Sequence, residues 1–383
     1  MELYKITKGV IIIVEIQKRT NYMDIMKGLA IITVVMGHCG ATGCHIIVLF
    51  HMALFFFISG YFYKEKYSES PFNLLKKRLI SLYVPFIKYE ILFLILHNLF
   101  CKIGFYSTQA NVVQNEYTIS NIINNVVHIL LFDGTEVLVS PLWFLASLFI
   151  VTMLFCLISF LTKNIKFKEL IRGLVIITLF IVGNYLTNIN LNIKNSLFAQ
   201  EIFNAAFVAL LFFYIGFIYR KIERRIPMNI LIAIESYIIL YVCAESGFVI
   251  DMRINYYPSI VMFLINSILG IYLMVYLSKK IDKVRFEFNL LKYIGRNTII
   301  IMALHSTCFK LAGLLQIAIY KLPMYKLGNF GATENIMHWW ALYVLVGVFV
   351  PIVIQYLIID KVSKLESYLH RKGNCDLGKI VND

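Results

Sequence analysis

The chain has 383 residues, of which 60% are apolar and only 15% are charged, and its formal net charge is +14. Soluble domains average about 45–50% apolar and about 25% charged residues, so this composition excludes an ordinary soluble globular protein. The 7 Pro and 20 Gly are too few for a disordered or fibrous chain.

Uninterrupted apolar runs predict membrane-spanning helices. A spanning helix needs about 20 predominantly apolar residues, and lipid requires every backbone polar group to be paired internally. The runs do not alternate with period two, which favours helices over strands. The ten expected spans are residues 24–43, 46–63, 79–101, 142–162, 170–188, 200–219, 228–244, 259–278, 293–320 and 338–360. The ninth run is long and carries charged residues, so we expect it to be tilted, broken or lining a cavity.

The positions of the basic residues predict how the spans are oriented. Of the 36 Lys and Arg, 26 lie in alternate segments between the spans and at the two ends, and only 5 lie in the intervening segments. By the positive-inside rule, both termini are cytoplasmic. We therefore expect an all-α fold, a polytopic bundle of about ten helices at residues 21–365, with a cytoplasmic segment at 1–20 and a cytoplasmic tail at 366–383.

The segments between the spans suggest no other function. The basic residues form short clusters and no aromatic-containing basic surface, so nucleic-acid binding is not expected. The longest intervening segment, about 102–141, contains one expected helix from Ile122 to Phe132, which we place at the membrane interface.

Span 1 carries three ionisable residues on one face, namely Asp24, Lys27 and His38. Lys27 and His38 are separated by about three helical turns and a rise of about 16 Å, and Asp24 falls on the same stripe. Ionisable groups at membrane depth indicate function, and histidine is the usual general base near neutral pH. The alternative is that Lys27 reaches the interface and His38 only binds a neighbouring helix.

Further histidines are expected near His38. His51 begins span 2 after a short connection, so it should lie at the same level as His38, and His305 on span 9 is a third candidate for one cavity. On span 3, Glu90 and His97 share a face, either as packing partners or as a proton relay.

A metal site is not expected in this region. The cluster of His38, Cys39, Cys44, His45 and His51 fits no structural zinc spacing and has no carboxylate nearby. Three glycines in spans 1 and 2 are expected to permit close helix contacts rather than to bind phosphate. They are Gly28, Gly37 and Gly60.

Several sequence runs, in order within residues 19–365, together resemble the bacterial membrane acyltransferase 3 family. The resemblance is closest to the branch that includes fucose 4-O-acetylases and O-acetyltransferases of capsule or O-antigen. The runs are Asp24 to His38, FHMALFFFISGYFY from Phe50 to Tyr63, KKRLISLYVPF from Lys76 to Phe86, PLWFL from Pro141 to Leu145, FNAAFVALLFFYIGFIYRK from Phe203 to Lys221, and YIGRNTIIIMALH from Tyr293 to His305.

The resemblance implies an integral O-acyltransferase of the bacterial cytoplasmic membrane. Its donor would be cytoplasmic acetyl-CoA, and its acceptor a hydroxyl of a surface polysaccharide or of its lipid-linked precursor. The essential histidine of the family corresponds to His38, its upstream basic residue to Lys27, and the basic residue leading into the third span to Arg78. The family usually has Arg at the position of Lys27, and Lys keeps the charge but cannot form a bidentate contact.

These considerations give a full set of expected roles. His38, with His51 and Asp24, forms the catalytic group, His38 being a general base or a covalent carrier of the acetyl group. Lys27 and Arg78 bind the donor, and no metal is required. Trp143 and His305 contact the glycan acceptor, although Trp143 also fits an interfacial aromatic belt. Membrane lipid is the remaining expected partner.

Two other functions fit a polytopic chain. A transporter or flippase of a lipid-linked sugar would favour inverted repeats with paired broken helices, and we find no internal repeat. A glycan polymerase would favour a large Arg-rich outer loop, whereas the longest intervening segment contains only Lys102.

Overall fold

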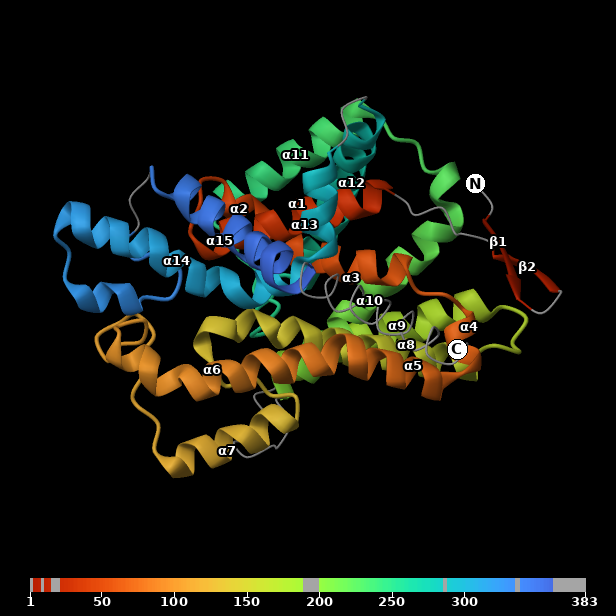
Figure 1. The fold of residues 1–383 in the computed structure, drawn as a ribbon. Coiled ribbons are helices and arrows are strands. Elements are labelled where there is room, and N and C mark those ends of the chain that lie inside the picture. The colour runs from red at the N-terminus through yellow and green to blue at the C-terminus, as the bar shows by residue number, and fades with distance from the viewer. Residues whose placement is uncertain are drawn as a thin grey trace, which may run out of the picture.

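The structure is a computed structural model that describes residues 3–7, 10–14, 21–188, 200–284, 288–334 and 338–360. Apart from an N-terminal antiparallel hairpin of β1 (Leu3–Thr7) and β2 (Val10–Val14), the described residues form an all-α bundle, as the sequence predicts. Figure 1 shows two groups of helices, with α3 lying between them.

The upper group in Figure 1 contains α1 and the helices from α11 to α15, and the lower group contains those from α5 to α10. The bounds in the first half of the chain are α1 Asn21–His38, α2 Cys44–Ile47, α3 His51–Tyr61, α4 Lys66–Glu69, α5 Pro71–Arg78, α6 Val84–Lys102, α7 Ile119–Leu130 and α8 Trp143–Leu161. In the second half they are α9 Lys168–Asn188, α10 Gln200–Ile222, α11 Ile230–Glu245, α12 Ile260–Lys283, α13 Asn289–Arg296, α14 Thr298–Tyr320 and α15 Trp340–Ile354.

Within the described residues, 7 helices are long and apolar enough to cross a membrane. They are Pro71–Lys102, Val137–Leu161, Lys168–Leu186, Ile202–Arg225, Ile260–Lys283, Thr298–Tyr320 and Trp340–Ile358. Each coincides with an expected span. The other three expected spans coincide with α1, the 11-residue α3 and the 16-residue α11. The total of ten spans and the cytoplasmic placement of both termini therefore stay predictions.

The ninth expected span is broken. Helix α13 ends at Arg296 and α14 begins at Thr298, so the run changes direction at Asn297. This break lets α13 pack along α1, where a Cβ on Gly295 would lie 1.9 Å from the carbonyl oxygen of Asp24. A side chain at position 295 would therefore separate the two helices.

Helix α3 is held at the centre of the bundle by two reciprocal glycine contacts with α10. A Cβ at Gly60 would lie 1.8 Å from the carbonyl oxygen of Phe213, and one at Gly216 would lie 1.9 Å from that of Phe57. The two backbones approach this closely only because neither residue has a side chain. Gly60 therefore has the expected role, whereas a Cβ at Gly37 would meet nothing within 4 Å. The space beside Gly37 belongs to a pocket.

The connection between α6 and α8 folds back along α6. At one end of this contact, Asn98 and the backbone of Tyr117 exchange two hydrogen bonds of 3.0 and 2.7 Å. At the other end, the Tyr83 hydroxyl donates to the carbonyl oxygen of Leu130 at 2.7 Å. Helix α7 thus runs antiparallel to α6, close to the expected bounds but alongside the bundle rather than across its end (Figure 1).

Candidate active site

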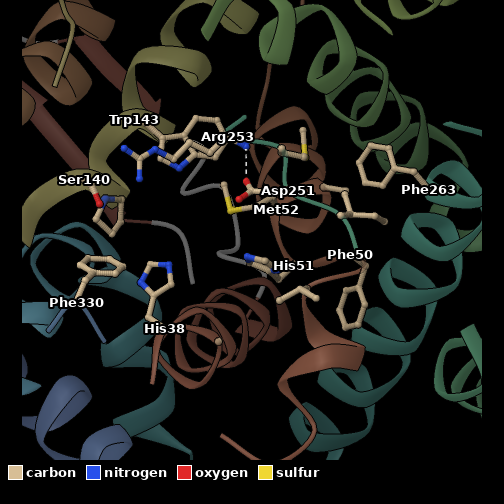
Figure 2. Close-up of a pocket in the computed structure, with 16 residues that line it drawn as sticks. His38, Phe50, His51, Met52, Ser140, Trp143, Asp251, Arg253, Phe263 and Phe330 are labelled. Carbon is tan, nitrogen blue, oxygen red and sulfur yellow. Dashed lines mark hydrogen bonds between the residues drawn. The ribbon is translucent and has the colours of Figure 1, made fainter. Parts of the chain in front are cut away.

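A pocket of about 260 Å³ lies where the end of α1 meets the start of α3. Its other walls come from the turn before α8 and from the connections that precede α12 and α15, so segments far apart in sequence meet there (Figure 2). We call it the His38 pocket. The lining residues that matter most for its chemistry are His38, His51, Trp143, Asp251, Arg253 and Phe330.

His38 is hydrogen-bonded to a second imidazole, that of His305. His38 Nδ1 lies 2.7 Å from His305 Nε2, and the rings stack with centroids 4.9 Å apart. His305 Nδ1 lies 2.8 Å from the carbonyl oxygen of Ile301, which can only accept a hydrogen bond. His305 therefore carries its proton on Nδ1, and its Nε2 accepts from His38 Nδ1–H. When both rings are neutral, His38 Nε2 is left unprotonated.

His51 lines the same pocket with a similar arrangement. Its Nδ1 lies 3.1 Å from the carbonyl oxygen of Ile47, one turn back, so Nδ1 is the donor and, in the neutral ring, Nε2 is the unprotonated nitrogen. The structure places His51 and His38 in one pocket, as the sequence predicts. In contrast, His305 is fully buried behind His38 and is not among the residues that line the pocket.

The rest of the pocket lining includes residues that sequence reasoning did not select. Trp143 is present as expected, but Asp251 and Arg253 come from the connection between α11 and α12, and Phe330 from the connection before α15. The Phe330 ring packs against His38 with centroids 5.9 Å apart. One signal was available in the sequence, because Arg253 is one of only 5 basic residues in the intervening segments.

A buried lysine positions the segment that carries Phe330. Lys310 on α14 is 1% exposed, and its Nζ donates to the carbonyl oxygens of Leu327 at 2.7 Å and Asn329 at 2.8 Å. From the other side, Asn111 exchanges side-chain hydrogen bonds with the backbone of Phe330 at 2.7 and 3.1 Å. Both contacts hold Phe330 over His38.

Asp24 is not in the pocket. It is 1% exposed, and its Oδ2 accepts a hydrogen bond from Arg296 Nε at 3.0 Å. On one helix, Asp24 and His38 are separated by about 21 Å of rise, so the carboxylate cannot touch a group that reacts at His38. The pair joins the start of α1 to the end of α13. The structure gives Asp24 a positioning contact rather than a catalytic one.

Lys27 and Arg78, the expected donor-binding residues, lie outside the His38 pocket. Lys27 Nζ lies 4.2 Å from the centre of the Phe62 ring, just beyond α3. Arg78 ends α5, and its Nε is buried without a hydrogen-bond partner within the described residues. We call this side of the bundle the Lys27 end, and the side with the pocket the His38 end.

Basic side chains surround Tyr67 at the Lys27 end. Partial burial raises the pKa of Tyr67, but the hydrogen bond from Lys77 and the positive charges of Lys77, Lys64 and Arg78 outweigh it, so the pKa lies below its ordinary value. The Lys77 ammonium donates to the Tyr67 hydroxyl at 3.2 Å. Such a surface attracts anions.

The other titratable candidates, His97 and Glu90, form hydrogen bonds outside the His38 pocket. His97 Nδ1 lies 3.0 Å from Glu136 Oε2 and its Nε2 donates to the carbonyl oxygen of Asn115 at 2.9 Å, so this ring anchors the segment that folds back along α6. Glu90 supports the same segment by accepting from the backbone of Thr135 at 3.1 Å. In the part of the chain that the structure describes, no three His, Cys, Asp or Glu side chains form a group that could hold a metal.

Comparison with known protein families identifies the family of the chain. The model of the acyltransferase domain of the acyltransferase 3 family matches residues 20–359. The chain belongs to the acyltransferase 3 family. This match confirms the resemblance of the sequence runs. Neither the curated proteins nor the solved structures contain a match to the chain.

A member of the acyltransferase 3 family needs a group that accepts a proton from the attacking nucleophile. An imidazole nitrogen without a proton can do this near neutral pH. In this acyltransferase, His38 and His51 both provide such a nitrogen in one pocket, and only His38 has a second imidazole behind it. The geometry therefore favours His38 as the base.

Proposed function

We propose that this membrane acyltransferase transfers an acetyl group from acetyl-CoA to a hydroxyl of a cell-surface glycan or its lipid-linked precursor. The reaction would take place in the bacterial cytoplasmic membrane, with the Lys27 end facing the cytoplasm. Family membership supports the acyl transfer. The observation that carries the role of His38 is its 2.7 Å hydrogen bond to His305, which leaves Nε2 free to accept a proton.

In the proposed reaction His38 first acts as a base and then as an acid. Its Nε2 removes the proton of the acceptor hydroxyl while the oxygen forms a bond to the thioester carbonyl carbon. The carbon–sulfur bond then breaks, and His38 returns the proton to the sulfur, so that the products are the acetyl ester and the free thiol. No net proton is gained or lost.

His305 is the proposed positioning residue for this step. Its Nε2 accepts from His38 Nδ1–H before and during transfer, which fixes the tautomer and stabilises the charged His38 ring. His51 would hold the acceptor hydroxyl next to His38, since its unprotonated Nε2 accepts hydrogen bonds in the same pocket.

The donor would enter from the Lys27 end. Its phosphates would be attracted by Lys27, Arg78 and the nearby lysines, and its extended arm would carry the thioester over the rise of about 16 Å along α1 to His38. Packed helices around this route would exclude water that would otherwise hydrolyse the thioester.

Replacement of His38 tests the proposal. In membrane vesicles given acetyl-CoA labelled in the acetyl group, His38→Ala should lower transfer of label to membrane glycan by about 10³-fold, within the range for loss of a general base. His45→Ala is the matched control, because His45 pairs with Glu245 at 3.1 Å and does not line the pocket. Near-normal transfer by a folded His38→Ala protein would refute the assignment.

A further inference from the structure

The connection between α11 and α12 is built to present two charged side chains to the His38 pocket. Asp251 and Tyr256 exchange backbone hydrogen bonds of 3.1 and 2.8 Å, and Asp251 Oδ1 accepts from the backbone nitrogen of Arg253 at 2.8 Å. Ile250 and Met252 are buried, at 5% and 3% exposed. Because these anchors alternate with Asp251 and Arg253, the two charged residues are left facing outward at the pocket.

The two charges lie on different sides of the pocket. Figure 2 shows the Arg253 guanidinium on the side of His38 and Ser140, and the Asp251 carboxylate on the side of His51. The pocket therefore has a positive group near the proposed base and a negative group farther from it.

Arg253 contrasts with two arginines of the bundle, Arg172 and Arg296, that each have an acidic partner. Arg172 lies 2.8 Å from Glu65, and Arg296 lies 3.0 Å from Asp24. Within the described residues, no ion pair is formed by the Arg253 guanidinium. Asp251, the acidic residue that lines the pocket, lies on the side of His51 and forms no ion pair with this guanidinium (Figure 2).

We propose that the acyl acceptor is an anionic glycan, and that Arg253 binds a carboxylate or phosphate group on the sugar whose hydroxyl faces His38. This inference rests on the proposed function and names the class of its acceptor. A guanidinium forms charge-assisted, often bidentate hydrogen bonds with either group. Trp143 would supply the apolar surface for the sugar ring, and Asp251 would accept hydrogen bonds from hydroxyls on the opposite side.

An anionic acceptor would also assist the reaction itself. His38 becomes positively charged when it takes the hydroxyl proton, and the guanidinium in the same pocket repels that charge. An anion bound to Arg253 offsets this repulsion. Acceptors with a correctly placed negative group should therefore be favoured both in binding and in turnover.

Binding of matched sugars tests this proposal without requiring turnover. The probes are methyl β-D-glucoside, methyl β-D-glucuronide and methyl β-D-glucoside 6-phosphate, titrated into the full-length protein in lipid nanodiscs and followed by ligand-observed NMR. We expect at least one anionic probe to bind about tenfold more tightly than the neutral one, as one charge-assisted contact allows. Which of the two binds better distinguishes a carboxylate from a phosphate.

Variants assign the preference to Arg253. Arg253→Gln should remove the preference, Arg253→Lys should keep part of it, and Asp251→Asn should increase it because a repelling charge is lost. Lys102→Gln is the control, since Lys102 is an exposed cation at the end of α6 and does not line this pocket. The proposal is overturned if the neutral sugar binds as well as both anions, if neither anion binds, or if the preference survives in Arg253→Gln.

A second measurement separates this inference from the proposed function. Thiol release from acetyl-CoA that depends on His38, combined with no preference for anions, would retain the proposed function and refute the role of Arg253. A preference for anions that depends on Arg253, without any thiol release dependent on His38, would do the reverse.

Discussion

The two ends of the helix bundle differ in how their charged and titratable groups are paired. At the His38 end, the pocket contains two histidines whose Nδ1 atoms are bound to a ring nitrogen or a backbone carbonyl, and an arginine that forms no ion pair within the described residues. At the Lys27 end, acidic groups are matched with basic ones. Glu223, for example, accepts from Tyr22 at 2.7 Å and from Lys279 at 2.9 Å.

This difference indicates that the two ends of α1 have different functions. Paired charges hold helix ends together, and the excess of basic residues at the Lys27 end would attract the proposed anionic donor. Groups that react must be able to contact a ligand. The His38 end has two ring nitrogens and one guanidinium that can form hydrogen bonds with a ligand in the pocket. Substitutions at the two ends should therefore change different quantities, namely turnover at one end and donor affinity or stability at the other.

The largest difference between the two ends is expected for His305, which lies behind the proposed reacting ring of His38. His305→Ala removes the acceptor of His38 Nδ1–H, so His38 can adopt the wrong tautomer and its charged form loses a hydrogen bond. We expect kcat to fall by about 10²-fold with little change in the KM for acetyl-CoA. Steady-state transfer assays with varied donor concentration measure both constants.

A conservative variant distinguishes positioning from packing at this residue. The side-chain oxygen of His305→Gln can still accept from His38 Nδ1–H, so this variant should recover part of kcat. If the Ala and Gln variants lost the same activity, or if both only lowered the amount of folded protein, the hydrogen bond between the two rings would have no catalytic role.

Much of the fold could be predicted because the apolar runs are long. Lipid leaves few alternatives for such runs, and all ten expected spans coincide with helices. The course of α7 was not predictable in the same way. Its position along α6 depends on single contacts such as that between Tyr83 and Leu130, and these leave no periodic signal in the sequence.

The candidate site was predictable only where it is built from helices. Helical spacing and a short connection were enough to place His38 and His51 near each other, and the structure brings them into one pocket. Helical spacing also put Asp24 on the same stripe, but a shared stripe says nothing about a separation of about 21 Å along the axis. Asp251 and Arg253 lie in a connection, where the path of the chain depends on tertiary contacts and not on periodicity.

A smaller effect is expected from Lys27, and it should appear in donor affinity. Lys27→Gln should raise the KM for acetyl-CoA by about three- to tenfold with kcat unchanged, the range for one solvent-accessible charge contact. Lys27→Arg should keep or lower the KM, since a guanidinium can bind a phosphate through two hydrogen bonds. Initial rates at several salt concentrations measure this, because screening should weaken donor binding more in the wild type than in Lys27→Gln.

Lys166→Gln is the control for this comparison, since it removes an exposed positive charge from the connection between α8 and α9. If Lys27→Gln and Lys166→Gln changed the KM equally, the effect would belong to the overall charge and not to Lys27. A change in kcat with an unchanged KM would show that Lys27 does not bind the donor. The two ends would then not differ in the kinetic constant that they control.

The smallest effect is expected at Glu65, whose charge pairing at the Lys27 end should make stability depend on pH. Partial burial raises the pKa of this carboxyl, but the hydrogen bond from Arg172 and the charges of Lys221 and Lys168 lower it from 4.5 to about 2. The pairing therefore stabilises the folded protein above about pH 4.5, and the contribution disappears as the pH falls towards 2. The Glu65 side chain is 42% exposed, so solvent screens the pairing and the effect is small.

Thermal unfolding between pH 5 and pH 3 tests this dependence, in the range of about one pH unit either side of 4 where the unfolded carboxyl titrates. The difference in unfolding temperature between the wild type and Glu65→Gln should narrow as the pH falls, because only in the wild type does the unfolded state take up a proton at residue 65 over this range. Glu69→Gln is the control, since Glu69 is an exposed residue at the end of α4, and this variant should follow the wild type at each pH. A difference that stayed constant over the whole range would show that Glu65 acts through packing, and that the pairing of charges at this end adds nothing to stability.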